Sequence, residues 1–195
     1  MMPVGILGGT FDPIHYGHLI TAQAVKEIRK LDKIIFIPAN ISPHKIEIKS
    51  LVKEHRLKML QLGIENISYF EYSDLELKRD SVSYTIDTLK KLRSKYDQME
   101  LIIGYDNIFD FNTWKDPDEI LELAKLIVVR RKTSIEPKKK DKYFNSAIFV
   151  DTPTIEISSS EIRQRIIEHL PINFLVPPKV NEYINKFNLY KERTF

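Results

Sequence analysis

Short apolar runs alternate along the chain with longer segments in which apolar residues recur at helical spacing. Residues 4–7 are apolar and are followed by two glycines, which predicts a buried strand that leads into a tight turn. Residues 17–31 carry an apolar residue at every third position, which predicts a helix with one buried face. A second apolar run at 34–37, stopped by Pro38, predicts the next strand. The helix positions expected to point inward are Leu19, Ala22, Val25 and Ile28.

The same alternation continues to the end of the chain. A strand, a helix and a strand within about 35 residues form a βαβ unit, whose strands are parallel and whose crossover is right-handed. Repetition of this unit predicts a Rossmann-like α/β fold, an open and mainly parallel sheet with helices on both faces. We expect one domain over residues 1–195, with a C-terminal helical part from about 158. Further strands are expected at 68–72, 101–103, 126–129 and 147–150, and further helices at 51–62, 85–96, 117–124, 158–169 and 178–187.

This layout indicates where functional residues should lie. In open α/β sheets, ligands bind beyond the carboxyl ends of the strands, where the strand order reverses. The turns that follow Leu7, Ile37, Ile103 and Val150 are therefore the places to expect a site. The segment 132–145 is expected to be a loop that the core does not need.

Composition narrows the functional classes. The chain has 195 residues, 43% hydrophobic and 29% charged, without an apolar run long enough to span a bilayer. It has no cysteine, which excludes disulfides, thiolate catalysis and cysteine-ligated metals. The N-terminus lacks the features of a signal peptide, so a cytoplasmic location and no membrane partner are expected. The net charge of +3 is weak, and the basic run at 138–142 lacks interleaved aromatic residues, so no nucleic-acid partner is expected.

The turn after the first strand carries the clearest chemical signal. Residues 8–18 read GGTFDPIHYGH, and the two glycines allow a backbone to approach a ligand closely. The helix that follows offers N–H groups and a positive dipole end, which together bind anions. His15 and His18 lie three residues apart at that end, so both rings can face one anion, with Gly17 keeping the space open. A metal site is the rival interpretation, but zinc needs three or four ligands and the pattern here is directed at phosphate.

This turn resembles the signature of the HxGH nucleotidylyltransferases, and within that superfamily the chain most resembles the bacterial nicotinate-nucleotide adenylyltransferases. The resemblance includes a late motif of the form ISSxxIR, which stands at residues 157–163. The two motifs are about 140 residues apart, so their joint occurrence is highly specific. Smaller matches cover nearly the whole chain: Ser42-Pro43-His44-Lys45, His55-Arg56, Ser83-Tyr84-Thr85, Gly104-Tyr105-Asp106, Trp114, Tyr183-Ile184 and Leu189-Tyr190.

The resemblance implies transfer of the adenylyl group of ATP to nicotinate mononucleotide, forming deamido-NAD and pyrophosphate, with Mg²⁺ arriving on the ATP phosphates. Such a step needs mainly position and positive charge from the protein. The histidines would stabilise the α-phosphate, and the N-terminus of the late helix, with Arg163, would hold the outgoing phosphates. The implied catalytic residues are His15, His18, Lys45 and Arg163, and the implied ATP-binding residues are Gly8, Gly9, Thr10, Phe11, His18, Gly104, Asp106, Ser159, Ser160 and Arg163.

The implied mononucleotide site involves Tyr84, Thr85, Trp114 and Lys45. By the resemblance, Trp114 stacks on the pyridine ring. The backbone of Thr85, at the start of a helix, would bind a carboxylate, which favours nicotinate over nicotinamide. Arg56 is left open between a functional role and ordinary surface charge.

Several alternatives remain at the level of sequence. A nicotinamide-mononucleotide adenylyltransferase differs chiefly in how it reads the amide. Phosphopantetheine adenylyltransferases usually have threonine at the position of His15, and cytidylyltransferases have a different late motif. A class I aminoacyl-tRNA synthetase needs far more than 195 residues. A non-catalytic nucleotide sensor on the same fold is expected to lose one of His15, His18 or Arg163, and all three are present. A homo-oligomer is compatible with the sequence, which does not fix the oligomeric state.

Overall fold

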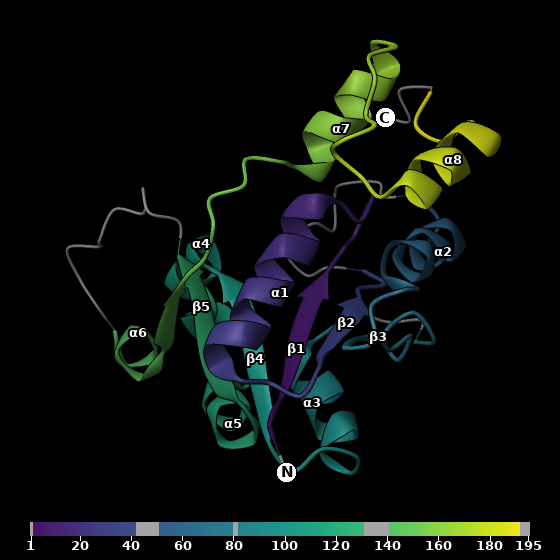
Figure 1. Ribbon diagram of the computed structural model, residues 1–195. Helices are drawn as coiled ribbons and strands as arrows, with labels where there is room; N and C mark the ends of the chain where they lie inside the picture. The colour runs from purple at the N-terminus through teal and green to yellow at the C-terminus, as the bar shows by residue number, and fades with distance from the viewer. Residues whose placement is uncertain (1, 42–50, 80–81, 131–140, 192–195) are drawn as a thin grey trace.

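The computed structural model describes residues 2–41, 51–79, 82–130 and 141–191 (Figure 1). Within these residues six strands form one sheet in the order β3-β2-β1-β4-β5-β6, and every neighbouring pair is parallel. This order reverses between β1 and β4, where connections leave toward opposite faces and a crevice opens beyond the strand ends. The strands are β1 (Val4–Gly9), β2 (Ile34–Pro38), β3 (Phe70–Tyr72), β4 (Met99–Gly104), β5 (Lys125–Arg130) and β6 (Ile148–Asp151).

Helices cover both faces of the sheet. Alternate residues of each strand point to opposite faces, so Ile34 and Phe36 of β2 pack into one cluster while Ile35 and Ile37 pack into the other. The first cluster contains residues of α1, α2, α7 and α8, and the second contains residues of α3, α4, α5 and α6. The helices are α1 (Tyr16–Arg29), α2 (Lys53–Ile64), α3 (Thr85–Arg93), α4 (Tyr105–Phe109), η1 (Phe111–Thr113), α5 (Pro117–Leu123), α6 (Lys142–Ser146), α7 (Ser159–Ile167) and α8 (Pro178–Lys186).

The last two helices lie at the carboxyl end of the sheet. In Figure 1 the arrow of β1 points toward α7 and α8, and the N-terminus lies at the opposite end of the strand. Buried apolar residues on both helices, Ile162 on α7 and Val180 and Ile184 on α8, join the same cluster as α1 and α2. The late motif is therefore carried to the edge of the sheet where the turn after β1 lies. In the parts of the chain that the structure describes, no helix combines the length and the apolar character needed to cross a bilayer.

The predicted fold class is confirmed, and every predicted strand and helix is present with its ends shifted by a few residues. Two details were wrong. Ile28 is 52% exposed, because positions three residues apart drift off one face of a helix that has about 3.6 residues per turn, and the buried face of α1 ends at Val25. The end of segment 132–145 is also not dispensable: it forms most of α6, whose Tyr143 and Phe144 are buried against the second core cluster.

Candidate active site at the carboxyl ends of β1 and β4

The loop between β1 and α1 brings its backbone unusually close to side chains. A Cβ atom added to Gly9 would lie 2.9 Å from the ring of Phe11, so a larger residue here would displace this buried ring. A Cβ on Gly8 would meet no atom within 4 Å, which shows that this residue faces open space. Phe11 has a left-handed backbone (φ 49°) and a buried side chain, whose ring packs edge-on against His18 and Phe36 with centroids 5.1 and 5.6 Å apart. Only the backbone of Phe11 is left for the predicted ATP contact.

The two histidines come together as the sequence predicted. His15 immediately precedes α1 in an extended conformation, and His18 lies in the first turn of that helix. Their rings stack, with centroids 3.6 Å apart and planes inclined by 28°. The backbone N–H of His15 donates to Nδ1 of His18 at 3.3 Å. Because Nδ1 accepts this bond, a neutral His18 carries its proton on Nε2.

Close packing around His15 explains the glycine between the two histidines. A Cβ atom on Gly17 would lie 3.0 Å from Cε1 and Nδ1 of His15 and 3.3 Å from the carbonyl oxygen of Ile157. The space that Gly17 leaves is thus filled by the His15 ring and by the backbone that leads into α7. Burial lowers the pKa of His15 from 6.5 to about 4, because the charged ring loses its hydration. At neutral pH the His15 ring is therefore uncharged.

The late motif docks directly on the first turn. Ser158 caps α7 by accepting a hydrogen bond from the backbone N–H of Glu161 at 3.1 Å. Ser159 Oγ donates to the carbonyl oxygen of Pro13 at 2.9 Å. Arg163 donates from Nη1 to the carbonyl oxygen of Asp12 at 2.7 Å and from Nη2 to Ser160 Oγ at 3.3 Å. Two motifs about 140 residues apart in sequence therefore form one continuous polar surface.

Arg56 is buried and bonds to the same first turn. Its side chain is 1% exposed, so the interpretation as ordinary surface charge is wrong. The guanidinium donates to the carbonyl oxygens of Leu51 at 3.0 Å, Thr10 at 2.8 Å and Asn40 at 3.5 Å. Burial lowers the pKa of Arg56, and the nearby Asp12 opposes this shift. Through these hydrogen bonds Arg56 links the turn after β1 to the segment after β2.

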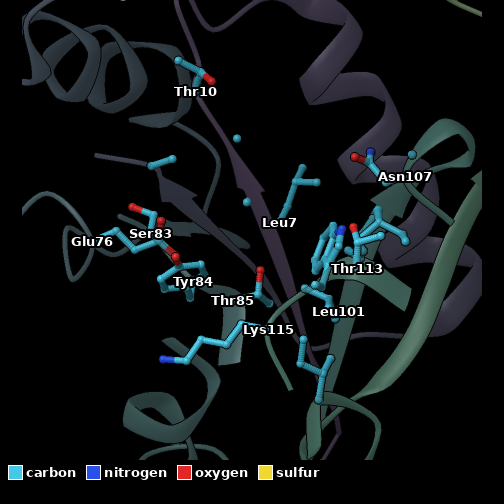
Figure 2. Close-up of a pocket in the computed structure, with 18 residues that line it drawn as sticks. Leu7, Thr10, Glu76, Ser83, Tyr84, Thr85, Leu101, Asn107, Thr113 and Lys115 are labelled. Atoms are coloured by element: carbon cyan, nitrogen blue, oxygen red, sulfur yellow. The ribbon is translucent and has the colours of Figure 1, made fainter. Parts of the chain in front are cut away.

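A cavity of about 320 Å³ opens beside this surface, at the reversal of strand order between β1 and β4. In Figure 2, Glu76, Ser83 and Tyr84 lie on one side of it, and Asn107 and Thr113 lie on the other, with Leu7 of β1 between them. The predicted site residues that line the cavity are Gly8, Gly9, Thr10, Tyr84, Thr85, Gly104 and Trp114.

Trp114 belongs both to the core and to the cavity wall. Its ring lies 5.1 Å from that of the buried Phe111, tilted by 37°, and it lines the cavity. The neighbouring Lys115 reaches along the same wall, with Nζ 3.3 Å from both carboxylate oxygens of Asp87 and 4.9 Å from the ring centre of Tyr84. The aromatic ring of Tyr84 and the ammonium group of Lys115 therefore lie close together at the start of α3.

The start of α3 is held by a buried carboxyl group that sequence reasoning missed. Glu76, which lines the cavity, accepts a hydrogen bond from Thr88 Oγ1 at 2.7 Å, and Ser83 also bonds to it. Ser83 Oγ in turn accepts from the backbone N–H of Asn40 at 3.0 Å. Burial raises the pKa of Glu76, while the bonds from Thr88 and Ser83 lower it. The sequence showed only a charged stretch around Glu76, without any signal that this one carboxyl is buried.

Not every predicted residue lies on the cavity. His15, His18, Ser159, Ser160 and Arg163 form the polar surface described above, next to Gly8, Gly9 and Thr10. Asp106 is exposed on α4 and does not line the cavity, so its contact with ATP stays a prediction. Lys45 lies outside the described residues. The residues that the structure describes include no group of three His, Cys, Asp or Glu side chains placed to hold a metal ion.

Comparison with known proteins gives a consistent result. Residues 6–165 match the family described as cytidylyltransferase-like. A protein of Thermoanaerobacter sp. (strain X514) named probable nicotinate-nucleotide adenylyltransferase is 41% identical over 199 residues, which cover 97% of this chain and 94% of the relative. A protein of the same name from Caldicellulosiruptor saccharolyticus is 40% identical and covers 98% of this chain and 100% of the relative.

Solved structures agree on the fold. The Plasmodium falciparum nicotinic acid mononucleotide adenylyltransferase complexed with NaAD aligns with a TM-score of 0.77 at 24% identity, covering 97% of this chain and 98% of that one. The same parasite protein complexed with APC aligns with a TM-score of 0.75. At this identity the likeness concerns the fold, while the family follows from the closer relatives. The chain belongs to the nicotinate-nucleotide adenylyltransferase family and matches the cytidylyltransferase-like family over residues 6–165.

Proposed function

We propose that this protein transfers the adenylyl group of ATP to nicotinate mononucleotide, giving deamido-NAD and pyrophosphate, as a step in NAD biosynthesis. The observation that carries the proposal is the junction of the two phosphate-directed motifs, made by Ser159 on Pro13 and Arg163 on Asp12. This junction stands beside a cavity with an aromatic wall and a helix N-terminus, which suits a pyridine carboxylate.

The chemistry is a single displacement at phosphorus. A phosphate oxygen of the mononucleotide attacks the α-phosphorus of ATP, the bond from that phosphorus to the bridging oxygen of the β-phosphate breaks, and pyrophosphate leaves with the bonding electrons. The nucleophile is already an anion, so the protein needs no general base. Its task is to align the two anions and to stabilise the charge that develops on the α-phosphate oxygens.

The two histidines divide this task. His15 is neutral at working pH because burial lowers its pKa to about 4, so it contributes a directed hydrogen bond rather than a full charge. His18 is oriented by the bond that its Nδ1 accepts from the His15 backbone, which presents Nε2 as its donor. The stacked rings fix both orientations before substrate arrives, so little reorganisation is required during the reaction.

Arg163 and the N-terminus of α7 provide the positive potential for the departing pyrophosphate. Arg163 is anchored by its bonds to Asp12 and Ser160, which hold the guanidinium at the edge of the first turn. The first backbone N–H groups of α7, at Ser159 and Ser160, add the helix dipole. We propose that Lys45 adds a further point charge.

Substrate choice depends on the wall formed by α3 and Trp114. Tyr84, the residue before α3, has an extended backbone, and among the described residues its side chain makes no capping bond to the helix. The first turn of α3 therefore suits a carboxylate ligand, and Lys115 adds positive charge there, which its pairing with Asp87 partly offsets. The amide of nicotinamide is uncharged and would gain no such electrostatic stabilisation there, so we propose preference for the acid over the amide.

Members of this family use ATP with a divalent metal ion. We propose Mg²⁺, bound by the triphosphate oxygens and water, because Mg²⁺ keeps most of its waters and is commonly brought by substrate phosphates. The residues described around the turn fit this arrangement, since the side chain of Asp12 is engaged by Tyr190 and by the Leu51 backbone rather than directed at a ligand. The expected location is the cytoplasm, where ATP is supplied.

The proposal is tested by pyrophosphate release from ATP and Mg²⁺ with either nicotinate mononucleotide or nicotinamide mononucleotide. The expected result is rapid release with the acid and a much lower kcat/KM with the amide. Equal use of both, or preference for the amide, would retain adenylyl transfer but reject the proposed acid preference. If neither substrate supports release, the enzyme assignment fails and a nucleotide sensor becomes the better explanation.

A further inference from the structure

The C-terminal end of the described chain returns to the first turn and bonds to its acidic residue. Tyr190, which follows α8 by four residues, donates its hydroxyl to Asp12 Oδ1 at 2.6 Å. The two residues are 178 positions apart in sequence. Burial and the neighbouring Asp12 raise the pKa of Tyr190 far above its ordinary value, so the hydroxyl stays protonated and remains a donor. The contact is thus a charge-assisted hydrogen bond, the stronger class.

The backbone after α8 is shaped to make this contact. Asn188 and Tyr190 both have left-handed conformations, with φ 51° and 64°, and the intervening Leu189 is buried in the first core cluster. Asparagine tolerates this conformation, but a bulky residue such as tyrosine adopts it rarely and keeps it only where its surroundings hold it. For Tyr190 the holding contacts are the bond to Asp12 and the packing against Met59 and its neighbours.

Asp12 is the point at which several segments meet. Its side chain is 5% exposed and accepts a second bond at Oδ2, from the backbone N–H of Leu51 at 3.2 Å. Its backbone carbonyl accepts the bond from Arg163. Asp12 therefore connects the C-terminal tail, the segment before α2 and the late motif to the loop that leads into His15. Asp12 lies three residues before His15, so a change in the position of Asp12 would change the position of the paired histidines.

We propose that Tyr190 is a positioning residue for the adenylyl transfer: through Asp12, the C-terminal tail fixes the first turn so that the histidine pair and Arg163 face one phosphate. This inference rests on the proposed function. It assigns Tyr190 no contact with substrate, so its effect should fall on the chemical step rather than on binding. Displacements of about 1 Å in catalytic groups can reduce turnover roughly a hundredfold, which makes such a role measurable.

The test compares Tyr190→Phe with Tyr183→Phe. Tyr183 is a matched control because it lies in the same C-terminal region and its hydroxyl also makes one side-chain bond, to Nδ1 of His55 at 2.9 Å, between α8 and α2. For Tyr190→Phe we expect kcat to fall roughly tenfold to a hundredfold, with KM for ATP and mononucleotide within about twofold of wild type. For Tyr183→Phe we expect unchanged kcat. Equal, small effects of both substitutions on kcat would overturn the proposal.

A second measurement does not depend on turnover. The ring signals of His15 can be titrated by NMR in ¹⁵N-labelled protein, and in wild type its pKa should lie near the value of about 4 that burial imposes. If Tyr190 holds the turn, Tyr190→Phe should move the pKa of His15 back toward 6.5, while Tyr183→Phe should not. An unchanged His15 pKa in Tyr190→Phe would show that Tyr190 contributes only to overall stability, which contradicts the proposal.

A double-mutant cycle tests whether Tyr190 acts through Asp12. Because Tyr190 is proposed to act through Asp12, the variant carrying both Tyr190→Phe and Asp12→Asn should lose no more kcat than the more damaging single variant. Losses that multiply would show independent effects and would contradict the proposal. Wild-type protein that is inactive with both mononucleotides would instead refute the proposed function, and the NMR titration would still decide whether Tyr190 positions the turn.

Discussion

The two halves of the site are held together in different ways. The phosphate side comprises the turn after β1 with its two histidines and the start of α7. Its contacts join segments far apart in sequence: the buried guanidinium of Arg56 and the half-buried guanidinium of Arg163 bond directly to backbone carbonyls of this turn. On the mononucleotide side, the start of α3 is held by the buried Glu76, but Lys115 and Tyr84 in front of it are exposed side chains that contact each other, and Lys115 also pairs with Asp87.

In the proposed mechanism, this difference separates the residues that act in the chemical step from those that select the substrate. Phosphoryl chemistry requires fixed geometry, and a network of bonds to backbone atoms provides it, because backbone positions change little when surface side chains move. Recognition of a pyridine substituent can instead rest on a wall of side chains, which can be exchanged without disturbing the turn. Substitutions on the phosphate side should therefore alter kcat, and those on the other side should alter KM and substrate preference.

The largest effect should follow from His18→Ala, which tests the phosphate side. Loss of a preorganised donor at the α-phosphate should lower kcat by about 10²–10³-fold, with the fold intact by circular dichroism and melting temperature. His169→Asn provides a control, because His169 is an exposed histidine beyond the end of α7. If His18→Ala retains near-normal turnover, the charge-stabilising role of His18 is wrong.

Trp114→Ala tests the opposite side and should have the next largest effect. Loss of an aromatic stacking surface is worth about 1–3 kcal/mol, so KM for the mononucleotide should rise roughly tenfold or more. KM for ATP should change less than about twofold, and it serves as the internal control. An equal rise in both KM values would refute the stacking assignment and would remove the contrast between the two halves.

Low pH should lower the free energy of unfolding, because His15 is buried in its neutral form. Its folded pKa of about 4 lies below the ordinary value of 6.5, so the unfolded chain binds a proton that the folded protein excludes between these values. Stability is therefore intact above pH 6.5 and is lost as the pH falls toward 4, by about 2 kcal/mol between pH 7.5 and pH 5. Urea unfolding at both pH values should show this loss in wild type and a smaller loss in His15→Asn. Identical pH dependence in the two proteins would contradict the burial of a neutral His15.

The smallest expected effect concerns substrate preference. Lys115→Met should lower the ratio of kcat/KM for acid over amide by about threefold, since an exposed and already paired charge contributes less than 1 kcal/mol. Lys90→Met is the matched control. Lys90 lies on α3 and pairs with Glu119 of α5 at 2.8 Å, but it does not line the cavity. A ratio that stays unchanged in Lys115→Met would assign acid recognition to the α3 backbone alone.

The features that could be predicted from the sequence depend on contacts between residues close together in the chain, and the features that could not depend on distant contacts. The turn after β1, the capped start of α7 and the βαβ order are local patterns, and each was predictable because period, glycine position and cap residues lie within a few positions of one another. The short helix α4 and the turn η1 were missed, since five and three residues are too few to show a helical period.

Residues whose state depends on distant partners could not be read from the sequence. Arg56 resembles many surface arginines along the chain, and its burial depends on carbonyl groups of Thr10 and Asn40 in other loops. Glu76 is buried because Thr88 and Ser83 bond to it from around the start of α3. Tyr190 and Asp12 are separated by almost the whole chain, and no local pattern signals their bond.

In the proposed mechanism, the joined motifs direct attack to the α-phosphorus of ATP. It is tested most directly by incubating the wild-type protein, Mg²⁺ and nicotinate mononucleotide with ATP labelled at either the α- or the γ-phosphorus. We expect the α-label to appear in a dinucleotide with the mass of deamido-NAD and the γ-label to appear only in pyrophosphate. Transfer of the γ-label to the mononucleotide, or retention of both labels in ATP, would contradict it.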